Sequence, residues 1–170
     1  LPPSISIPMD DFTFGSLALL TTSNIAVEGN GAMLYLDINL GSNRLLHFDP
    51  IDSLTSTPSL RLSDLTISGF WNRPVEVFDD SVDDDDDSPP QGLDGGALFL
   101  RGDVDLLIRN VTFRNTVGVS GGAIYISNND KAAYIEGCTF SYCEATSDGG
   151  SIYIDRNTFS IQVVNSSFIG

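Results

Sequence analysis

A pair of glycines followed by a short apolar segment recurs three times in the second half of the chain. The three segments are "DGGALFLR", "SGGAIYIS" and "DGGSIYID", and their glycine pairs lie 26 and 28 residues apart. A second recurring segment lies between them, spaced by 27 and 28 residues, and it ends at Phe113, Phe140 and Phe168. Two markers that keep one period indicate a repeat protein, in which each repeat is a structural unit that stacks on its neighbours.

Alignment on these phenylalanines, taken as position zero, adds two earlier segments that end at Val27 and Ile67. Positions −7 and −5 are largely apolar and share one face of a strand, and positions −2 and 0 share a face of the next strand. Position −3, between the two strands, holds only residues that tolerate a left-handed backbone. They are Asn24, Asp64, Asn110, Gly137 and Asn165. Each repeat is therefore predicted to contain a strand, a tight corner, a strand, a loop and the glycine-pair strand.

The glycine-pair strand also forms columns when the repeats are aligned. Alternation within it predicts that Leu98, Ile124 and Ile152 point into a core. The intervening aromatic residues are then predicted to face outward in a column, to which "GAMLYLD" at 31–37 adds a fourth member. The predicted column is Tyr35, Phe99, Tyr125 and Tyr153.

Three short strands in about 27 residues predict one coil of a right-handed parallel β-helix, an all-β fold. We expect five to six coils and a rod of about 25 Å, because parallel strands lie about 4.8 Å apart. The prediction is one domain over 1–170, interpreted as part of a longer solenoid, with an N-terminal cap at 1–16 that covers a bare sheet edge. One long acidic loop is inserted at 71–94, and regular glycine-pair repeats fill 95–170.

The glycine-pair segments, paired with a strand that contains phenylalanine, resemble the repeats of the polymorphic outer-membrane protein family. The segments "SNIAVEGNGAMLYL" and "LRLSDLTISGF" are similar more generally to the pectin-lyase-like superfamily. Both resemblances imply a right-handed parallel β-helix. The first implies a secreted or surface-exposed protein, often adhesive, and the second implies polysaccharide lyases and hydrolases. The match to the first is imperfect, since its repeats have the pattern Phe-x-x-Asn, and the third residues after Phe113 and Phe140 are Thr116 and Cys143.

Charge and hydropathy restrict the partners. The formal net charge of −15 argues against nucleic acid and anionic membranes, and no apolar run approaches the roughly 20 residues of a membrane span. The chain opens on Leu1, which we interpret as a processed or partial chain, and the family resemblance implies a secreted or cell-surface location. We expect partners at the C-terminal edge, either other subunits or further coils of the same chain, and glycans as further ligands.

Several residues are candidates for binding or modification. The outward aromatic column is either ordinary packing or an interface for a second chain or for sugar rings. Asn110 and Asn165 begin N-glycosylation sequons. The acid run in the 71–94 insertion is either a solvated loop or a weak calcium site. We expect no cofactor other than this calcium. The residues of the acid run are Asp83, Asp84, Asp85, Asp86 and Asp87.

The two cysteines, Cys138 and Cys143, leave three alternatives open. Cys138 lies at the inward position −2, which suits a small buried apolar residue. A disulfide between the two would require a sharp turn at 141–142. Stacking of a cysteine on a further coil is the third alternative.

No pair of carboxylates falls in a pattern that indicates glycoside hydrolysis, and the single histidine, His47, is interpreted as structural. The first hypothesis is therefore a non-catalytic extracellular structural or adhesive protein, with a subunit of a surface filament or appendage as one form of it. The alternative is a secreted protein that binds or cleaves polysaccharide.

Overall fold

The structure, a computed structural model, shows an all-β protein. It describes residues 17–19, 25–35, 45–48, 57–70 and 94–170. These residues contain no helix, and so none that is long and apolar enough to cross a bilayer. The predicted cap at 1–16 and the acid run Asp83–Asp87 lie outside the described residues.

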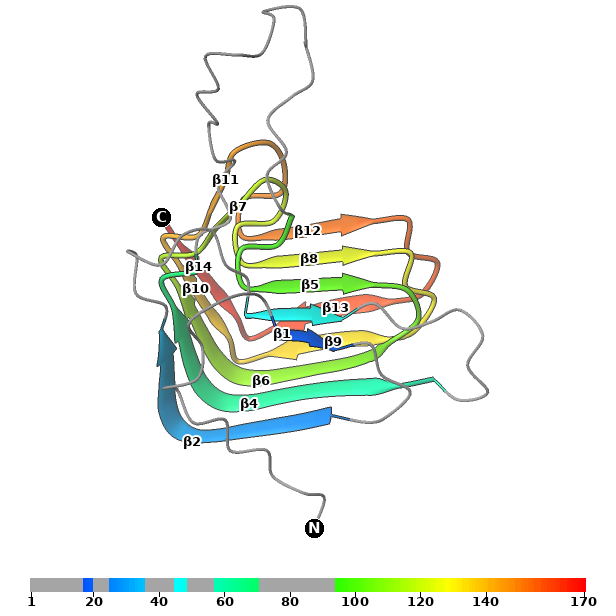
Figure 1. The fold of residues 1–170 in the computed structure, drawn as a ribbon, viewed down its shortest axis with the longest axis horizontal. Coiled ribbons are helices and arrows are strands. Elements are labelled where there is room, and N and C mark those ends of the chain that lie inside the picture. The colour runs from blue at the N-terminus through cyan, green and yellow to red at the C-terminus, as the bar shows by residue number, and fades with distance from the viewer. Residues whose placement is uncertain (1–16, 20–24, 36–44, 49–56, 71–93) are drawn as a thin grey trace, which may run out of the picture.

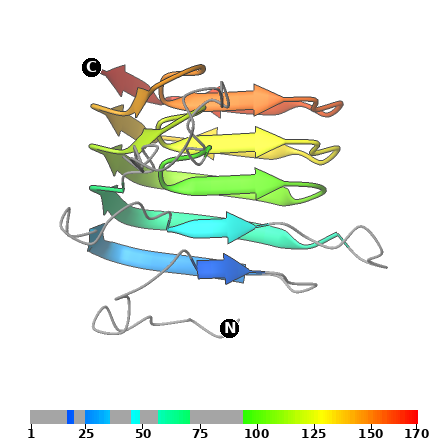
Figure 2. The ribbon, with the colours of Figure 1, turned by 45° about the horizontal axis from the view of Figure 1, so that its top comes forward.

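The first sheet has five parallel strands, each hydrogen-bonded to the strand one repeat away (Figures 1 and 2). In spatial order they are β1 (Leu17–Leu19), β3 (Leu46–Phe48), β5 (Leu98–Arg101), β8 (Ile124–Ser127) and β12 (Ile152–Asp155). The predicted register of the glycine-pair repeats is confirmed, because Tyr125 aligns with both Phe99 and Tyr153.

The second sheet has seven parallel strands and is bent. Three long strands cross the bend: β2 (Ile25–Tyr35), β4 (Ser59–Ser68) and β6 (Asp105–Arg114). In the last two repeats the same path is divided into two strands. These are β9 (Ala133–Glu136) with β10 (Thr139–Ser141), and β13 (Ile161–Val164) with β14 (Ser167–Ile169). A small third sheet pairs β7 (Val117–Gly118) with β11 (Glu144–Ala145).

The bend in the second sheet occurs at the predicted corner residues. Asp64, Asn110, Gly137 and Asn165 have φ values of 54°, 51°, 62° and 51°. These are left-handed values that asparagine, aspartate and glycine adopt at the lowest cost. Figure 1 shows β4 and β6 bending sharply along their length. The prediction of a one-residue corner is therefore confirmed at these four positions.

The two glycines of each pair have different physical roles. Gly95, Gly121 and Gly149 have φ between 69° and 82°, so the first glycine makes the turn. The second glycine gives room for the neighbouring repeat: a Cβ on Gly122 would lie 2.5 Å from the carbonyl oxygen of Glu144. Glycine therefore precedes these strands because of backbone geometry at one position and close backbone approach at the other.

The core lies between the two large sheets and consists of the inward columns. Leu98 and Ile124, predicted to point inward, are almost fully buried, and so are Leu100 and Ile126. Ile152, the third predicted residue, is partly buried against the core. Phe113, Phe140 and Phe168 form a stacked column, with ring centroids 5.0 and 4.9 Å apart and interplanar angles of 2° and 7°. Like side chains from successive repeats thus pack directly on one another.

The predicted alignment of the first repeat is wrong. Val27 pairs with Leu62, which places Val27 at position −5, and Leu34 pairs with Ile67 at position zero. Three residues of β2, 29–31, lie opposite the single corner residue Asp64. This local insertion shifts the first repeat, and the left-handed residue in it is Asn30, with φ of 48°.

Replacing Gly122 by alanine tests the close approach between repeats. We expect Gly122→Ala to lower the free energy of unfolding by about 3 kcal/mol, because the added Cβ would collide with the backbone of Glu144. The matched control is Gly150→Ala, where φ is 47° but the Cβ would meet no atom within 4 Å. It should cost about 1 kcal/mol from its backbone conformation alone. Equal costs in urea unfolding would contradict this explanation.

Candidate functional site

The outward aromatic column is a continuous stack on the five-stranded sheet. Phe99 and Tyr125 lie 5.0 Å apart at 2°, and Tyr125 and Tyr153 lie 5.4 Å apart at 16°. His47 continues the stack at its other end, with its ring 4.7 Å from that of Phe99 at 56°. The side chains of this column are half-buried: His47, Phe99, Tyr125 and Tyr153.

The predicted fourth member, Tyr35, is not in this column. Its backbone pairs with Ser68 in the seven-stranded sheet, while the five-stranded sheet places His47 opposite Phe99. The placement of Tyr35 was wrong because "GAMLYL" resembles a glycine-pair strand, whereas it forms the second half of the bent strand β2.

The geometry of the stack decides what it can bind. Sugar rings bind aromatic side chains through the ring faces. Both faces of Tyr125 are occupied by its two neighbours, and one face of Tyr153 is occupied by Tyr125. The column therefore offers ring edges and tyrosine hydroxyl groups along its length. Among the described residues, the stack ends at Tyr153 on β12 and at His47 on β3, where the neighbouring strand β1 has Ala18 at the same register position.

Acidic residues surround the end of this column. Partial burial, followed by the carboxylates of Asp155 and Asp148, raises the pKa of the Tyr153 phenol. The Asp155 carboxylate also forms an ion pair with Arg156, with an Nε to Oδ2 distance of 3.1 Å. Tyr153 is therefore a neutral hydrogen-bonding group at ordinary pH, in an acidic surrounding.

Both sequon asparagines lie at the exposed bend of the seven-stranded sheet. Asn110 and Asn165 are exposed, and the Nδ2 of Asn110 donates a hydrogen bond of 3.1 Å to Oδ1 of Asp64. Gly137 lies between them in the corner column, and a Cβ there would come within 2.8 Å of Oδ1 of Asn110. The glycine thus leaves the surface between the two asparagines without a side chain.

Both cysteines are free thiols in the structure, so no Cys138–Cys143 disulfide is present. Cys138 is buried in the core, and Cys143 packs against it from a partly buried position. Burial raises the pKa of both thiols. The interpretation of Cys138 as a small apolar core residue is confirmed by its burial.

The predicted calcium site lies outside the described residues. Within the described residues, no group of three or more His, Cys, Asp or Glu side chains is placed to hold a metal ion. Calcium binding by Asp83–Asp87 stays a prediction.

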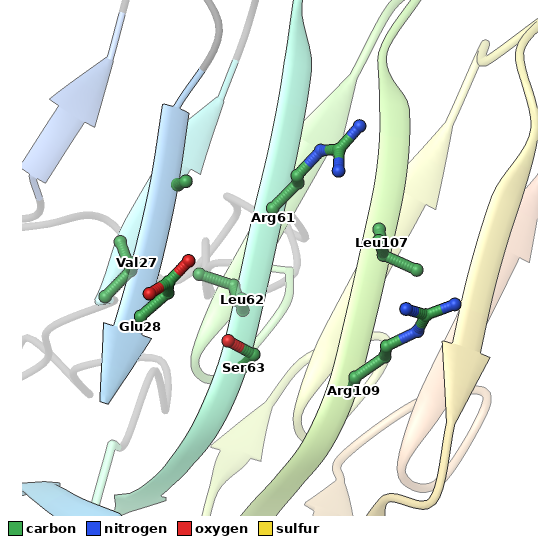
Figure 3. A pocket seen from close by; sticks show the side chains of 8 residues that line it. Val27, Glu28, Arg61, Leu62, Ser63, Leu107 and Arg109 are labelled. Carbon is green, nitrogen blue, oxygen red and sulfur yellow. The ribbon is translucent and has the colours of Figure 1, made fainter. Parts of the chain in front are cut away.

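A pocket of about 160 Å³ lies on the outer face of the seven-stranded sheet, over β2, β4 and β6 (Figure 3). It exists because two small outward residues, Ala26 and Ser63, are surrounded by large ones. The larger side chains around it are Glu28, Arg61, Leu107 and Arg109. Arg109 also pairs with Glu136, with an Nε to Oε2 distance of 3.0 Å.

The alignment of strands explains why this pocket was not predicted. Glu28, Ser63 and Arg109 are opposite one another on neighbouring strands. The first repeat was misaligned, so Glu28 was not placed beside Ser63. The two arginines lie on β4 and β6, whose predicted alignment was correct, so their position near Ser63 was already visible in a chain with only 8 lysines and arginines.

A column of hydroxyl side chains and a buried asparagine were also missed. Thr66, Thr112, Thr139 and Ser167 are aligned at position −1, and the last two hydroxyl groups are 3.3 Å apart. Asn129 is buried and bonds the preceding repeat, since its Nδ2 donates to the Val104 carbonyl and its Oδ1 accepts from the Val104 amide. The first column was visible in the sequence as the residue before position zero. The second falls in a loop between strands, where alignment gave no signal.

No protein-family model, curated protein or solved structure matches this chain.

Removing the middle ring of the aromatic column tests whether the column is structural. We expect Tyr125→Ala to lower the free energy of unfolding by about 2–3 kcal/mol, because stacking on two neighbours and half-buried packing are both lost. Tyr142→Ala is the control, since Tyr142 is 64% exposed and should change stability by less than about 0.5 kcal/mol. A Tyr125 variant as stable as the control would show that the column is free for binding.

Proposed function

We propose that this chain is a right-handed parallel β-helix that acts as a non-catalytic structural or adhesive element outside the cell. The observation that carries the proposal is the repeat-on-repeat register. Strands one repeat apart pair in parallel in both large sheets, and the same side-chain types stack along the core. Each repeat therefore packs against the next through the same kinds of strand edge and side chain that it uses to pack on the previous one. This suits a protein that extends along one axis.

Two further features support a role outside the cell. The sequon asparagines are both exposed at one bend, where attached sugars would meet solvent rather than the core. The strong negative charge favours solubility at high concentration and suits a protein exposed to the medium. Calcium held by the acid run Asp83–Asp87 is part of this proposal as a stabilising ion.

Duplicating one repeat tests the β-helix directly. Residues 117–143 span one period, because Val117 pairs with Glu144. Inserting a second copy of these residues after Cys143 should give a folded chain that unfolds cooperatively and is at least as stable as the parent, because the added repeat restores the same contacts. The control is a scrambled insert of the same composition at the same position. Loss of folding with both inserts would contradict a stack of equivalent repeats.

The pocket on the seven-stranded sheet favours a second candidate function, binding or cleavage of acidic polysaccharide. Arg61 and Arg109 line the pocket together with Ser63 and Leu107, and their two guanidinium groups outnumber the one carboxylate of the lining, Glu28, which suits a sugar ring that carries a carboxylate. Arg61 makes no ion pair within the described part of the chain, so its charge is available to a ligand.

Uronate oligomers distinguish the two functions. If the pocket binds them, the double variant Arg61→Ala, Arg109→Ala should lose at least about tenfold in affinity by calorimetry, since both charged partners are removed. Arg156→Ala is the control, because Arg156 directly follows β12, in the last described repeat, and does not line the pocket. Turnover of polyuronate by the parent chain, with or without calcium, would overturn the non-catalytic proposal. Binding without turnover would assign the pocket to adhesion.

A further inference from the structure

The local insertion in β2 places an asparagine and a glycine next to each other on the surface. Residues 29–31 lie opposite the single corner residue Asp64, and they include Asn30 and Gly31. The register between β2 and β4 is interrupted there, since it stops at Glu28 and resumes at Ala32. Asn30 and Gly31 are both exposed. The pair therefore lies outside the aligned part of the two strands, where water reaches it.

An asparagine that precedes a glycine is open to a reaction that needs no enzyme, and asparagine is among the chemically labile residue types. The backbone nitrogen of the glycine attacks the side-chain carbon Cγ of the asparagine and closes a succinimide ring. The bond between that nitrogen and Cγ forms, the bond between Cγ and Nδ2 breaks, and Nδ2 leaves as ammonia with the proton of the attacking nitrogen. Water then opens the ring at either carbonyl, which gives aspartate or isoaspartate.

The backbone of this pair is one peptide rotation away from the geometry of attack. Asn30 and Gly31 have φ values of 48° and 85°, the pattern of a type I′ turn. Rotation of the peptide between them gives the type II′ pattern, in which only the first residue keeps a positive φ. This rotation turns the Gly31 nitrogen toward the Asn30 side chain. Glycine accepts both signs of φ, and a Cβ on Gly31 would meet no described atom within 4 Å, so nothing described there hinders the rotation.

The other left-handed asparagines of the described chain lack this combination. Asn30 is the one asparagine in the sequence that precedes a glycine. The residues that follow the others are buried or hydrogen-bonded through their side chains: Val111, Thr116 and Asn129 are at most 1% exposed, and Ser166 donates to the Val164 carbonyl and accepts from the Cys138 amide. Their peptides are therefore held, whereas the peptide after Asn30 is not.

We propose that Asn30 is a site of spontaneous deamidation, which converts it to isoaspartate and aspartate in the folded protein. Both products place a second carboxylate at the bend opposite Asp64, and isoaspartate also adds a carbon atom to the main chain. Like charges on neighbouring strands are destabilising. Asp64 is exposed and accepts a hydrogen bond from Nδ2 of Asn110, so its carboxylate is held at this bend. Deamidation therefore weakens the pairing of β2 with β4.

Prolonged incubation of the full, folded chain, followed by peptide mapping with mass spectrometry, tests the modification. The peptide that contains Asn30 should gain the mass difference between an amide and a carboxyl group, and should become a substrate for isoaspartyl methyltransferase labelling. Gly31→Ala should slow the conversion at least about tenfold, because alanine loses the freedom of φ that the rotation needs. The peptides that contain Asn110 and Asn165 are internal controls and should stay unchanged over the same period.

The variant Asn30→Asp tests the consequence. It should unfold at a lower urea concentration than the parent, and the difference should shrink as salt is added, because salt screens the repulsion from Asp64. Adding Asp64→Asn to this variant should restore the parent midpoint. Asn165→Asp is the matched control, an exposed left-handed asparagine whose neighbour in the preceding repeat is Gly137, and its midpoint should stay close to that of the parent.

Three outcomes would overturn the proposal. The first is conversion of Asn30 in the urea-unfolded chain but not in the folded one. The second is an equal rate in the parent and in Gly31→Ala, which would show that the freedom of this glycine does not control the reaction. The third is an Asn30→Asp variant that unfolds at the same midpoint as Asn165→Asp, which would remove the repulsion from Asp64.

Discussion

Backbone hydrogen bonding between strands one repeat apart is the interaction on which this structure depends. Parallel pairing aligns each residue with the residue one repeat later, so any side chain is stacked on the side chain at the same position. Short strands of three or four residues gain little from pairing alone. They are stabilised because every column of aligned side chains is a packed column, such as the three phenylalanines of the core. Register and core packing therefore enforce one another.

The same alignment makes the backbone at the turns as restricted as the core. A corner in one repeat lies over the corner of the next, so a residue with unsuitable geometry would disturb two neighbours. The corner column satisfies this restriction because its residues adopt a left-handed backbone. Gly122 satisfies it because it has no side chain to collide with the backbone of Glu144. The sequence period is thus visible in two kinds of residue at once, the apolar residues that pack and the small or polar residues that turn.

Most of the fold could be predicted because the period appears in residues with distinct physical roles. Glycine pairs, position-zero phenylalanines and the corner column each gave the same register for the last three repeats. The first repeat could not be aligned, since residues 29–31 in β2 replace one corner residue and the glycine in them resembles a glycine pair. That single insertion accounts for the misplacement of Tyr35 and for the separation of Glu28 from the pocket. Ser63 and Arg109 were already opposite each other in the predicted alignment of β4 and β6. A site built across several strands needs every strand in register, so one error in alignment left this site incomplete but did not change the fold.

Stacking of like on like favours apolar columns and penalises charged ones, and the outward columns show how the chain avoids the penalty. Arg109 lies opposite Glu136 and forms an ion pair with it, and Lys131 reaches Asp103 at 3.3 Å. Ser120 separates the repeats of Asp94 and Asp148, and its amide donates a hydrogen bond to Oδ1 of Asp94. The run of five aspartates occurs, in contrast, in the insertion that interrupts the period. In the described sheets, opposite charges are paired and like charges are separated where repeats stack, so the walls can continue from repeat to repeat despite a strongly negative chain.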